Sequence, residues 1–134
     1  MNKEVKTLVL YRLERAHEAL DEALILLEKG YANTFVNRLY YACFYAVSAL
    51  LLTKGLSSSK HSGVRALFHQ NFLKHGTVNS EQGELYDKLF DTRQKGDYAD
   101  LVRFNIDEVR PWLNDANSFV VCLERLVQKE IKTG

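Results

Sequence analysis

Four polar side chains share one face of the most apolar stretch of the chain. They follow one another at intervals of three, four and three residues, which aligns them on one ridge of a helix: Arg38, Tyr41, Tyr45 and Ser48. A guanidinium and three hydroxyls on one ridge can donate hydrogen bonds to an anion such as phosphate. A structural role fits as well, with the arginine paired to a carboxylate and the tyrosines packed with satisfied hydroxyls. The spacing leaves both interpretations open.

A second polar group lies near the end of a later helix, in the sequence Arg93-Gln-Lys-Gly-Asp97-Tyr98. Charged and hydroxyl groups placed together in this way can belong to a functional site. The alternative is a routine helix end, where basic residues face the last carbonyl groups.

The sequence lacks a complete metal site or phosphate loop. Glu14 and His17 form a single Glu-x-x-His pair, whereas a di-iron bundle needs two such pairs and two further carboxylates. Cys-x-x-Cys and His-x-x-x-His pairs are absent, as are glycine-rich phosphate loops. Cys43 and Cys122 fall on apolar helical stripes, which predicts free, buried thiols. We therefore expect neither a metal ion nor a cofactor.

Charge is distributed unevenly, although the net charge is only +1. No acidic residue occurs between Glu28 and Glu81. This stretch either lies near the negative charge of a phosphate-rich ligand or contains a core helix with basic residues scattered over the surface. Its Lys and Arg residues are Lys29, Arg38, Lys54, Lys60, Arg65 and Lys74.

Apolar residues recur at helical spacing in the first half of the chain. The stripe of the first helix covers 13–27, and Gly30 follows in the position that usually ends a helix. A second helix is predicted from a cap at Asn33 to about Lys54. It is apolar around most of its circumference, which predicts a place at the centre of a bundle or in a subunit interface.

Three more helical segments follow. A short one covers 64–72, and a fourth begins at a cap formed by Asn79 and breaks near Gly96. The fifth carries an apolar stripe over 109–127, with its start or a kink at Pro111. No alternating strand pattern occurs. The predicted fold class is all-α, an up-and-down helical bundle of four main helices plus one short helix.

The N-terminal segment has no sustained hydrophobic region, since Arg12, Glu14 and Arg15 interrupt it. No apolar run approaches the roughly 20 residues that a membrane helix needs. We therefore expect a cytoplasmic protein that does not enter a membrane.

Two segments carry a resemblance to a known family: NRLYYACFYAVSALLLTKGLSSSKHSGVRALF and DTRQKGDYAD. Their order and spacing resemble a bacterial and archaeal branch of the HEPN superfamily, the higher eukaryotes and prokaryotes nucleotide-binding domains. The resemblance extends from the first helix into the last. The matching residues are Arg38, Tyr40, Tyr41, Ala42 and Phe44, then Lys54-Gly55, then His61-Ser62-Gly63, and finally Arg93, Asp97 and Tyr98.

The resemblance implies that 1–134 form a single HEPN-like helical domain that dimerises. Many HEPN proteins are metal-independent ribonucleases that act as the toxin beside a minimal nucleotidyltransferase antitoxin. Their signature is an arginine followed a few residues later by a histidine, in a cleft between subunits. The histidine would move the proton of a ribose 2′-OH, and the arginine would stabilise the charge on the phosphate.

This chain departs from that signature in two places. No histidine follows Arg93 at the expected spacing, where Tyr98 stands instead. Tyr45 occupies a position at which relatives often carry histidine. The resemblance thus implies catalytic roles for Arg93, Asp97 and Tyr98, and ligand-binding roles for Arg38, Tyr41, Tyr45 and His61.

Three functions stay open at this point. The first is a toxin-like, metal-independent ribonuclease. The second is a non-catalytic protein that binds RNA or a nucleotide and acts with a nucleotidyltransferase, for which Tyr98 is a candidate acceptor of the transferred nucleotide. The third is a dimeric interaction domain without a ligand.

Overall fold

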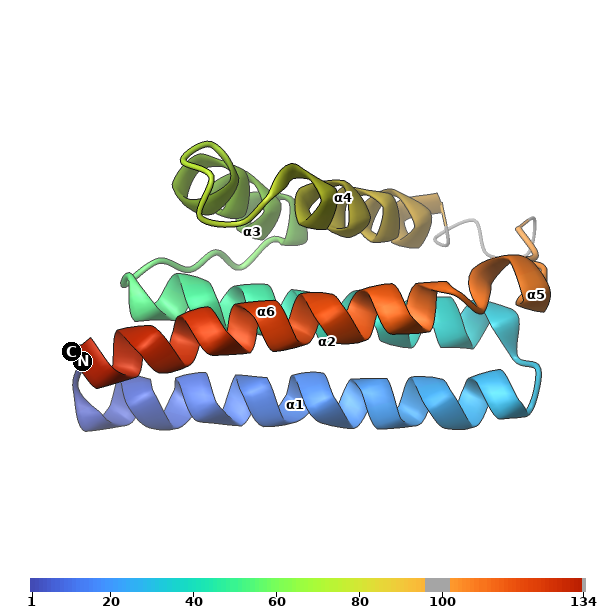
Figure 1. The fold of residues 1–134 in the computed structure, drawn as a ribbon, viewed down its shortest axis with the longest axis horizontal. Coiled ribbons are helices and arrows are strands. Elements are labelled where there is room, and N and C mark those ends of the chain that lie inside the picture. The colour runs from blue at the N-terminus through green and yellow to red at the C-terminus, as the bar shows by residue number, and fades with distance from the viewer. Residues whose placement is uncertain (96–101, 134) are drawn as a thin grey trace.

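The computed structural model describes residues 1–95 and 102–133, and these ranges are almost entirely helical (Figure 1). Asp97 and Tyr98 lie outside the described residues. The prediction of an all-α helical bundle is confirmed. Its elements are α1 (Lys3–Glu28), α2 (Ala32–Thr53), α3 (His61–Phe68), the π-helical turn η1 (His69–Leu73), α4 (Ser80–Lys95), α5 (Ile106–Val109) and α6 (Trp112–Thr133).

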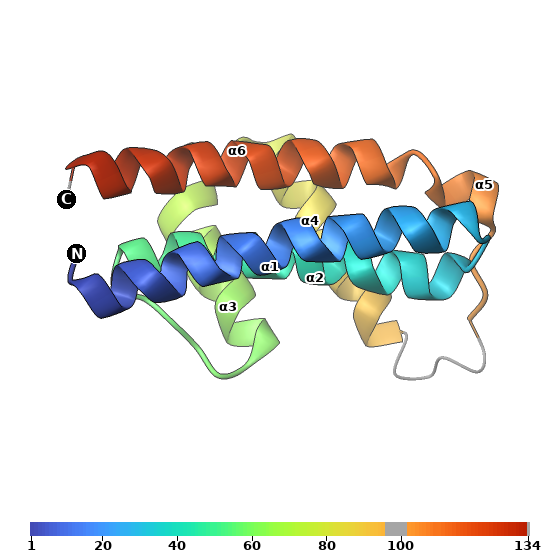
Figure 2. The same cartoon turned by 90° about the horizontal axis from the view of Figure 1, so that it is seen from below.

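Three long helices form the body of the bundle. α1 and α2 run antiparallel as a hairpin, and α6 lies beside both of them (Figures 1 and 2). α3 and α4 lie against α2 on the side away from α1 and cross the long helices obliquely (Figure 2). α2 contacts α1, α3, α4, α5 and α6, so it is the central helix, as its apolar circumference predicts.

By length and composition α2 could cross a membrane, the one such helix in the described part of the chain. Inside the bundle, however, 67% of its most apolar window is buried. Its largest fully buried side chains include Phe35, Leu39 and Tyr40. Burial of this extent is typical of the core helix of a bundle, which other helices cover on most of its sides.

Aromatic rings join α2 to the crossing helices. Tyr86 of α4 lies 6.1 Å from Tyr40 of α2 and 5.4 Å from Phe68 of α3, measured between ring centroids. Phe119 of α6 stacks on Tyr86 at 5.9 Å and meets Phe68 edge-on at 6.0 Å. These four rings, here called the aromatic core, are fully buried and fix α3 and α4 relative to α2.

Several predicted helix ends are confirmed. Gly30 and Gly55 follow α1 and α2 with φ angles of 79° and 71°, a left-handed conformation that glycine adopts without steric strain. The side chain of Asn79 accepts a hydrogen bond from the Gln82 backbone N–H at 2.9 Å and caps α4. Pro111 separates the short α5 from α6, because it disfavours helix at the preceding residue.

The predicted cap at Asn33 is wrong. α2 begins at Ala32, so Asn33 lies inside its first turn. Its side chain instead donates to the Val102 carbonyl oxygen at 2.7 Å and accepts from the Phe104 N–H at 2.9 Å. Both partners lie far along the chain, so the residue type alone could not reveal this role.

We expect Phe119→Ala to lower the free energy of unfolding by about 3–5 kcal/mol, because the aromatic core would be left with a cavity. Urea denaturation followed by circular dichroism measures this change. Val121→Ala in the same helix is the matched control: Val121 is 39% exposed, and its truncation should change stability by about 0.5 kcal/mol or less. Equal effects of the two substitutions would contradict the assigned core.

Candidate functional site

Arg93, in the last turn of α4, is held by tyrosines of α2. Its Nε donates a hydrogen bond to the Tyr41 hydroxyl at 3.3 Å. Its guanidinium carbon lies 5.5 Å from the Tyr40 ring centroid and 5.6 Å from that of Tyr41, within the range of cation–π attraction. The guanidinium is therefore placed by aromatic contacts, and its other N–H groups have no hydrogen-bond partner among the described residues, so they can bind an anion.

His61 is the first residue of α3 and packs on the same tyrosines. Its Nδ1 lies 2.7 Å from the Tyr40 hydroxyl oxygen. The imidazole stacks on Phe44 with 4.3 Å between centroids and meets the Tyr41 ring edge-on at 5.9 Å. The family resemblance implies only a ligand-binding role for His61, and the structure places it against the same two tyrosine rings as Arg93.

We call Arg93, His61, Tyr40, Tyr41 and Phe44 the Arg93–His61 cluster. Burial lowers the pKa of His61 below its ordinary value of 6.5, and the positive charge of Arg93 lowers it further. His61 is therefore neutral at pH 7 and can accept a proton. An arginine beside a neutral imidazole is a pair that can bind a phosphate and move a proton next to it.

Tyr40 holds the imidazole in position. Burial raises the pKa of Tyr40 to about 12, so its hydroxyl remains protonated at neutral pH. That hydroxyl can donate to Nδ1 or accept from it. When Nδ1–H donates to Tyr40, the lone pair of Nε2 is free to take up a proton, and the same contact supports the imidazolium that results.

The residues of the predicted ridge on α2 have partners in two different places. Arg38 pairs with Glu22 of α1 at 3.3 Å and lies 5.0 Å from the Tyr41 ring centroid, so it flanks the Arg93–His61 cluster. Its buried Nε has no hydrogen-bond partner among the described residues. Tyr45 faces α1 instead, where its hydroxyl accepts from Arg15 at 3.3 Å. Tyr41 and Tyr45 remain neighbours, with ring centroids 6.0 Å apart.

Several basic groups of the acid-free stretch find acidic partners on neighbouring helices. Lys54 pairs with Glu130 of α6 at 2.9 Å, and Arg65 pairs with Asp91 of α4 at 3.4 Å. With the Arg38–Glu22 pair, this accounts for half of its Lys and Arg residues. The absence of acids in this stretch is thus partly a structural pattern, in which α2 and α3 supply cations and the surrounding helices supply carboxylates.

No group of three metal-binding side chains occurs within the part of the chain that the structure describes. His17 pairs with Glu124 of α6 at 2.9 Å, so the Glu-x-x-His pair of α1 serves a surface contact. Cys43 and Cys122 are both free, as predicted, although Cys122 is only half-buried. Burial raises the pKa of the Cys43 thiol, which makes it a poor nucleophile.

Sequence reasoning did not assign a site role to Tyr40 or Phe44. Both were part of the matching Arg-x-Tyr-Tyr-Ala-x-Phe pattern, but helical spacing alone placed Tyr40 on an apolar stripe. The Tyr40 hydroxyl could have indicated such a role, because a tyrosine on a core face usually has a hydrogen-bond partner. His61 is that partner.

We expect a pKa below 6.5 for His61 in an NMR titration of the imidazole signals, and an increase toward 6.5 in Arg93→Gln, because a nearby positive charge is removed. Arg110→Gln, at an exposed and distant position, is the control. The folded state binds a proton on the His61 imidazole less readily than the unfolded state does. The stability that neutral His61 contributes is therefore present above pH 6.5, and it is lost as the pH falls through the lower pKa of the folded state. An unchanged His61 pKa in Arg93→Gln would contradict the arrangement.

Comparison with known proteins extends this picture. The family model described as the HEPN domain matches residues 9–126. A "UPF0332 protein" of Thermotoga maritima is 47% identical over 128 residues, covering 96% of both chains. "Putative toxin MJ0142" of Methanocaldococcus jannaschii is 31% identical over 91% of this chain and 84% of its own length, and "Putative toxin MJ0605" of the same organism is 37% identical over 74% of each. The chain belongs to the HEPN domain family.

Proposed function

We propose that this protein is a toxin-like HEPN protein whose Arg93–His61 cluster binds an RNA phosphate and cleaves the chain without a metal ion. The observation that carries the proposal is that Arg93 and His61 flank the same two rings, Tyr40 and Tyr41. Two relatives with toxin names, similar over most of this chain, support the toxin role.

In the proposed reaction Nε2 of neutral His61 takes the proton of a ribose 2′-OH. The 2′-oxygen attacks the adjacent phosphorus, and the bond from phosphorus to the 5′-oxygen breaks. The products are a 2′,3′-cyclic phosphate and a 5′-hydroxyl, which receives its proton from Tyr98 or from water. The guanidinium of Arg93 stabilises the charge that develops on the phosphate oxygens.

The other predicted site residues have supporting roles in this proposal. Arg38 adds positive charge beside the bound phosphate, and Tyr41 orients Arg93 through its hydroxyl. Tyr98 is proposed as the proton donor to the leaving group. Asp97 is the competing candidate for the base, and the neutral His61 beside Arg93 is the observation that favours His61 over it.

We also propose that residues 1–134 work as one HEPN unit that is a cytoplasmic homodimer and acts with a nucleotidyltransferase partner. The proposal rests on membership of the family and on the toxin names of its relatives. In a dimer a second copy of the cluster would lie in the same particle, and two cuts could be made in one encounter with RNA.

Cleavage of a mixed RNA pool by the purified protein in EDTA tests the reaction. We expect the wild type to cut RNA, and His61→Ala and Arg93→Ala each to lose about 10²–10⁴-fold in rate, as is typical for a proton-transfer residue or an oxyanion-stabilising group. His75→Ala and Arg110→Ala, both at exposed positions, are the matched controls and should retain the rate.

Two further variants assign the base. Asp97→Asn and Tyr98→Phe should each retain part of the rate if His61 is the base, whereas loss in Asp97→Asn with activity retained in His61→Ala would transfer the role to Asp97. A wild type that binds RNA but never cuts it would favour the second function, a non-catalytic nucleotide-binding partner of a nucleotidyltransferase.

Sedimentation equilibrium tests the dimer. We expect a mass about twice the 15.4 kDa of the chain, independent of loading concentration in the micromolar range. The measurement is made on the isolated protein and again with Arg93→Ala, which should not change the mass. A single species at 15.4 kDa would rule out a stable dimer.

A further inference from the structure

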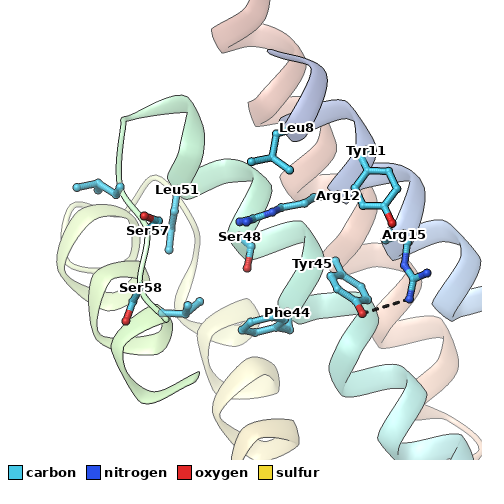
Figure 3. A pocket seen from close by; sticks show the side chains of 12 residues that line it. Leu8, Tyr11, Arg12, Arg15, Phe44, Tyr45, Ser48, Leu51, Ser57 and Ser58 are labelled. Carbon is cyan, nitrogen blue, oxygen red and sulfur yellow. Dashed lines mark hydrogen bonds between the residues drawn. The ribbon is translucent and has the colours of Figure 1, made fainter. Parts of the chain in front are cut away.

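A pocket of about 440 Å³ lies between α1, α2 and the segment that leads into α3 (Figure 3). This volume is within the range of about 300–1,000 Å³ that small-molecule sites occupy in proteins. None of the 12 residues that line the pocket is acidic. Neither Arg93 nor His61 lines it, so it is a place distinct from the Arg93–His61 cluster.

Arg12 supplies a cation to this pocket, and no acidic group in the described part of the chain pairs with it. Its side chain extends from α1 across the pocket toward Ser48 of α2 (Figure 3). Burial lowers the pKa of Arg12, and no described acidic group offsets that effect. An arginine nonetheless stays charged near neutral pH, so a partly desolvated guanidinium without an ion pair favours the binding of an anion.

Hydroxyl groups and a second arginine surround the same space. Ser48 is 5% exposed, and Ser57 and Ser58 lie on the opposite wall (Figure 3). Arg15 donates to the Tyr45 hydroxyl at 3.3 Å and also pairs with Glu18 of its own helix at 3.8 Å, so Arg12 is the main cation of the pocket. Two guanidiniums and several hydroxyls are the groups that proteins use to hold phosphate.

The rest of the wall is apolar and aromatic. Phe44, Leu51 and Leu56 line it, and Tyr11 stands at the rim beside Arg15 (Figure 3). A ligand that fits must therefore combine a phosphate with a flat or apolar part. A nucleotide has both, because its base offers a π-face to apolar and aromatic side chains.

The pocket adjoins the proposed catalytic cluster. Phe44 lines the pocket and stacks on His61 at 4.3 Å, and Tyr45 lines the pocket and lies 6.0 Å from Tyr41. Aromatic rings of α2 thus lie beside arginines of α1 and α4, and grooves that follow single-stranded nucleic acid combine the same two kinds of group.

We propose that this pocket binds the phosphate of a nucleotide, either as the neighbouring residue of an RNA chain held at the Arg93–His61 cluster or as a free nucleotide. The RNA version rests on the proposed function, and the free-nucleotide version is independent of it. Arg12 makes the main contact with phosphate, Arg15 adds a second, and the apolar wall holds the base.

Binding is measured by fluorescence anisotropy with a labelled 2′-O-methyl oligonucleotide, which lacks the 2′-OH needed for cleavage, and by calorimetry with AMP. We expect Arg12→Gln to weaken binding of at least one of these probes about tenfold, and to reduce the dependence of binding on salt by about one phosphate contact. Lys6→Gln, exposed on the same helix, is the control and should bind like the wild type.

Ser57→Glu is the second variant, because Ser57 is exposed and its replacement leaves the bundle core intact. The added negative charge should weaken the same binding, and melting curves check that both variants fold. Loss of AMP binding identifies a free-nucleotide site, and loss of oligonucleotide binding alone identifies an RNA subsite. Wild-type affinity in both variants, or no binding of either probe by the wild type, overturns the inference. Arg12-dependent binding without RNA cleavage would separate this site from the proposed reaction.

Discussion

The structure depends on one buried hydroxyl. Tyr40 is fully buried at the centre of α2, and a hydroxyl removed from water costs free energy unless it finds a hydrogen-bond partner. The imidazole of His61 meets that need at 2.7 Å and thereby ties the start of α3 to the middle of α2. The Tyr40 ring also packs against Tyr86, and its face attracts Arg93. The hydrogen bond that satisfies the buried Tyr40 hydroxyl therefore also determines which groups face one another at the candidate site.

Each of three arginines of this face contacts a tyrosine ring of α2. Arg15, Arg38 and Arg93 lie 5.3, 5.0 and 5.6 Å from the centroids of the Tyr45, Tyr41 and Tyr41 rings. A carboxylate partner would neutralise a guanidinium, whereas a ring orients it and leaves its charge in place. Arg15 and Arg38 also have carboxylate partners, Glu18 at 3.8 Å and Glu22 at 3.3 Å, whereas no described carboxylate pairs with Arg93. Arg93 is therefore the arginine of this face whose charge is best placed to meet an anion.

The sequence predicts the helices well because their determinants are local. Apolar spacing, Gly30 and Gly55 at helix ends, the Asn79 cap and the break at Pro111 all act within a few residues. Asn33 shows where this reasoning stops, since its partners Val102 and Phe104 are brought to it only by the tertiary fold. The same holds for the candidate site: no spacing rule links His61 to Arg93, because the crossing of α3 and α4 over α2 decides their proximity. Arg12 was not singled out for binding, since a lone arginine on an amphipathic helix has no distinguishing sequence signal.

The apolar circumference of α2 also has a consequence for biosynthesis. α2 leaves the ribosome long before α6, which covers one of its faces only after the intervening helices have been made. Directly after α2 is made, α1 is its sole completed neighbour, and the nascent chain exposes an apolar helix long enough to resemble a membrane span. Assembly of the candidate site waits for the same event, since α3 and α4 rest on the surface that α6 helps to close. Until α6 packs, we therefore expect the nascent chain to expose apolar surface and to have an incomplete candidate site at the same stage.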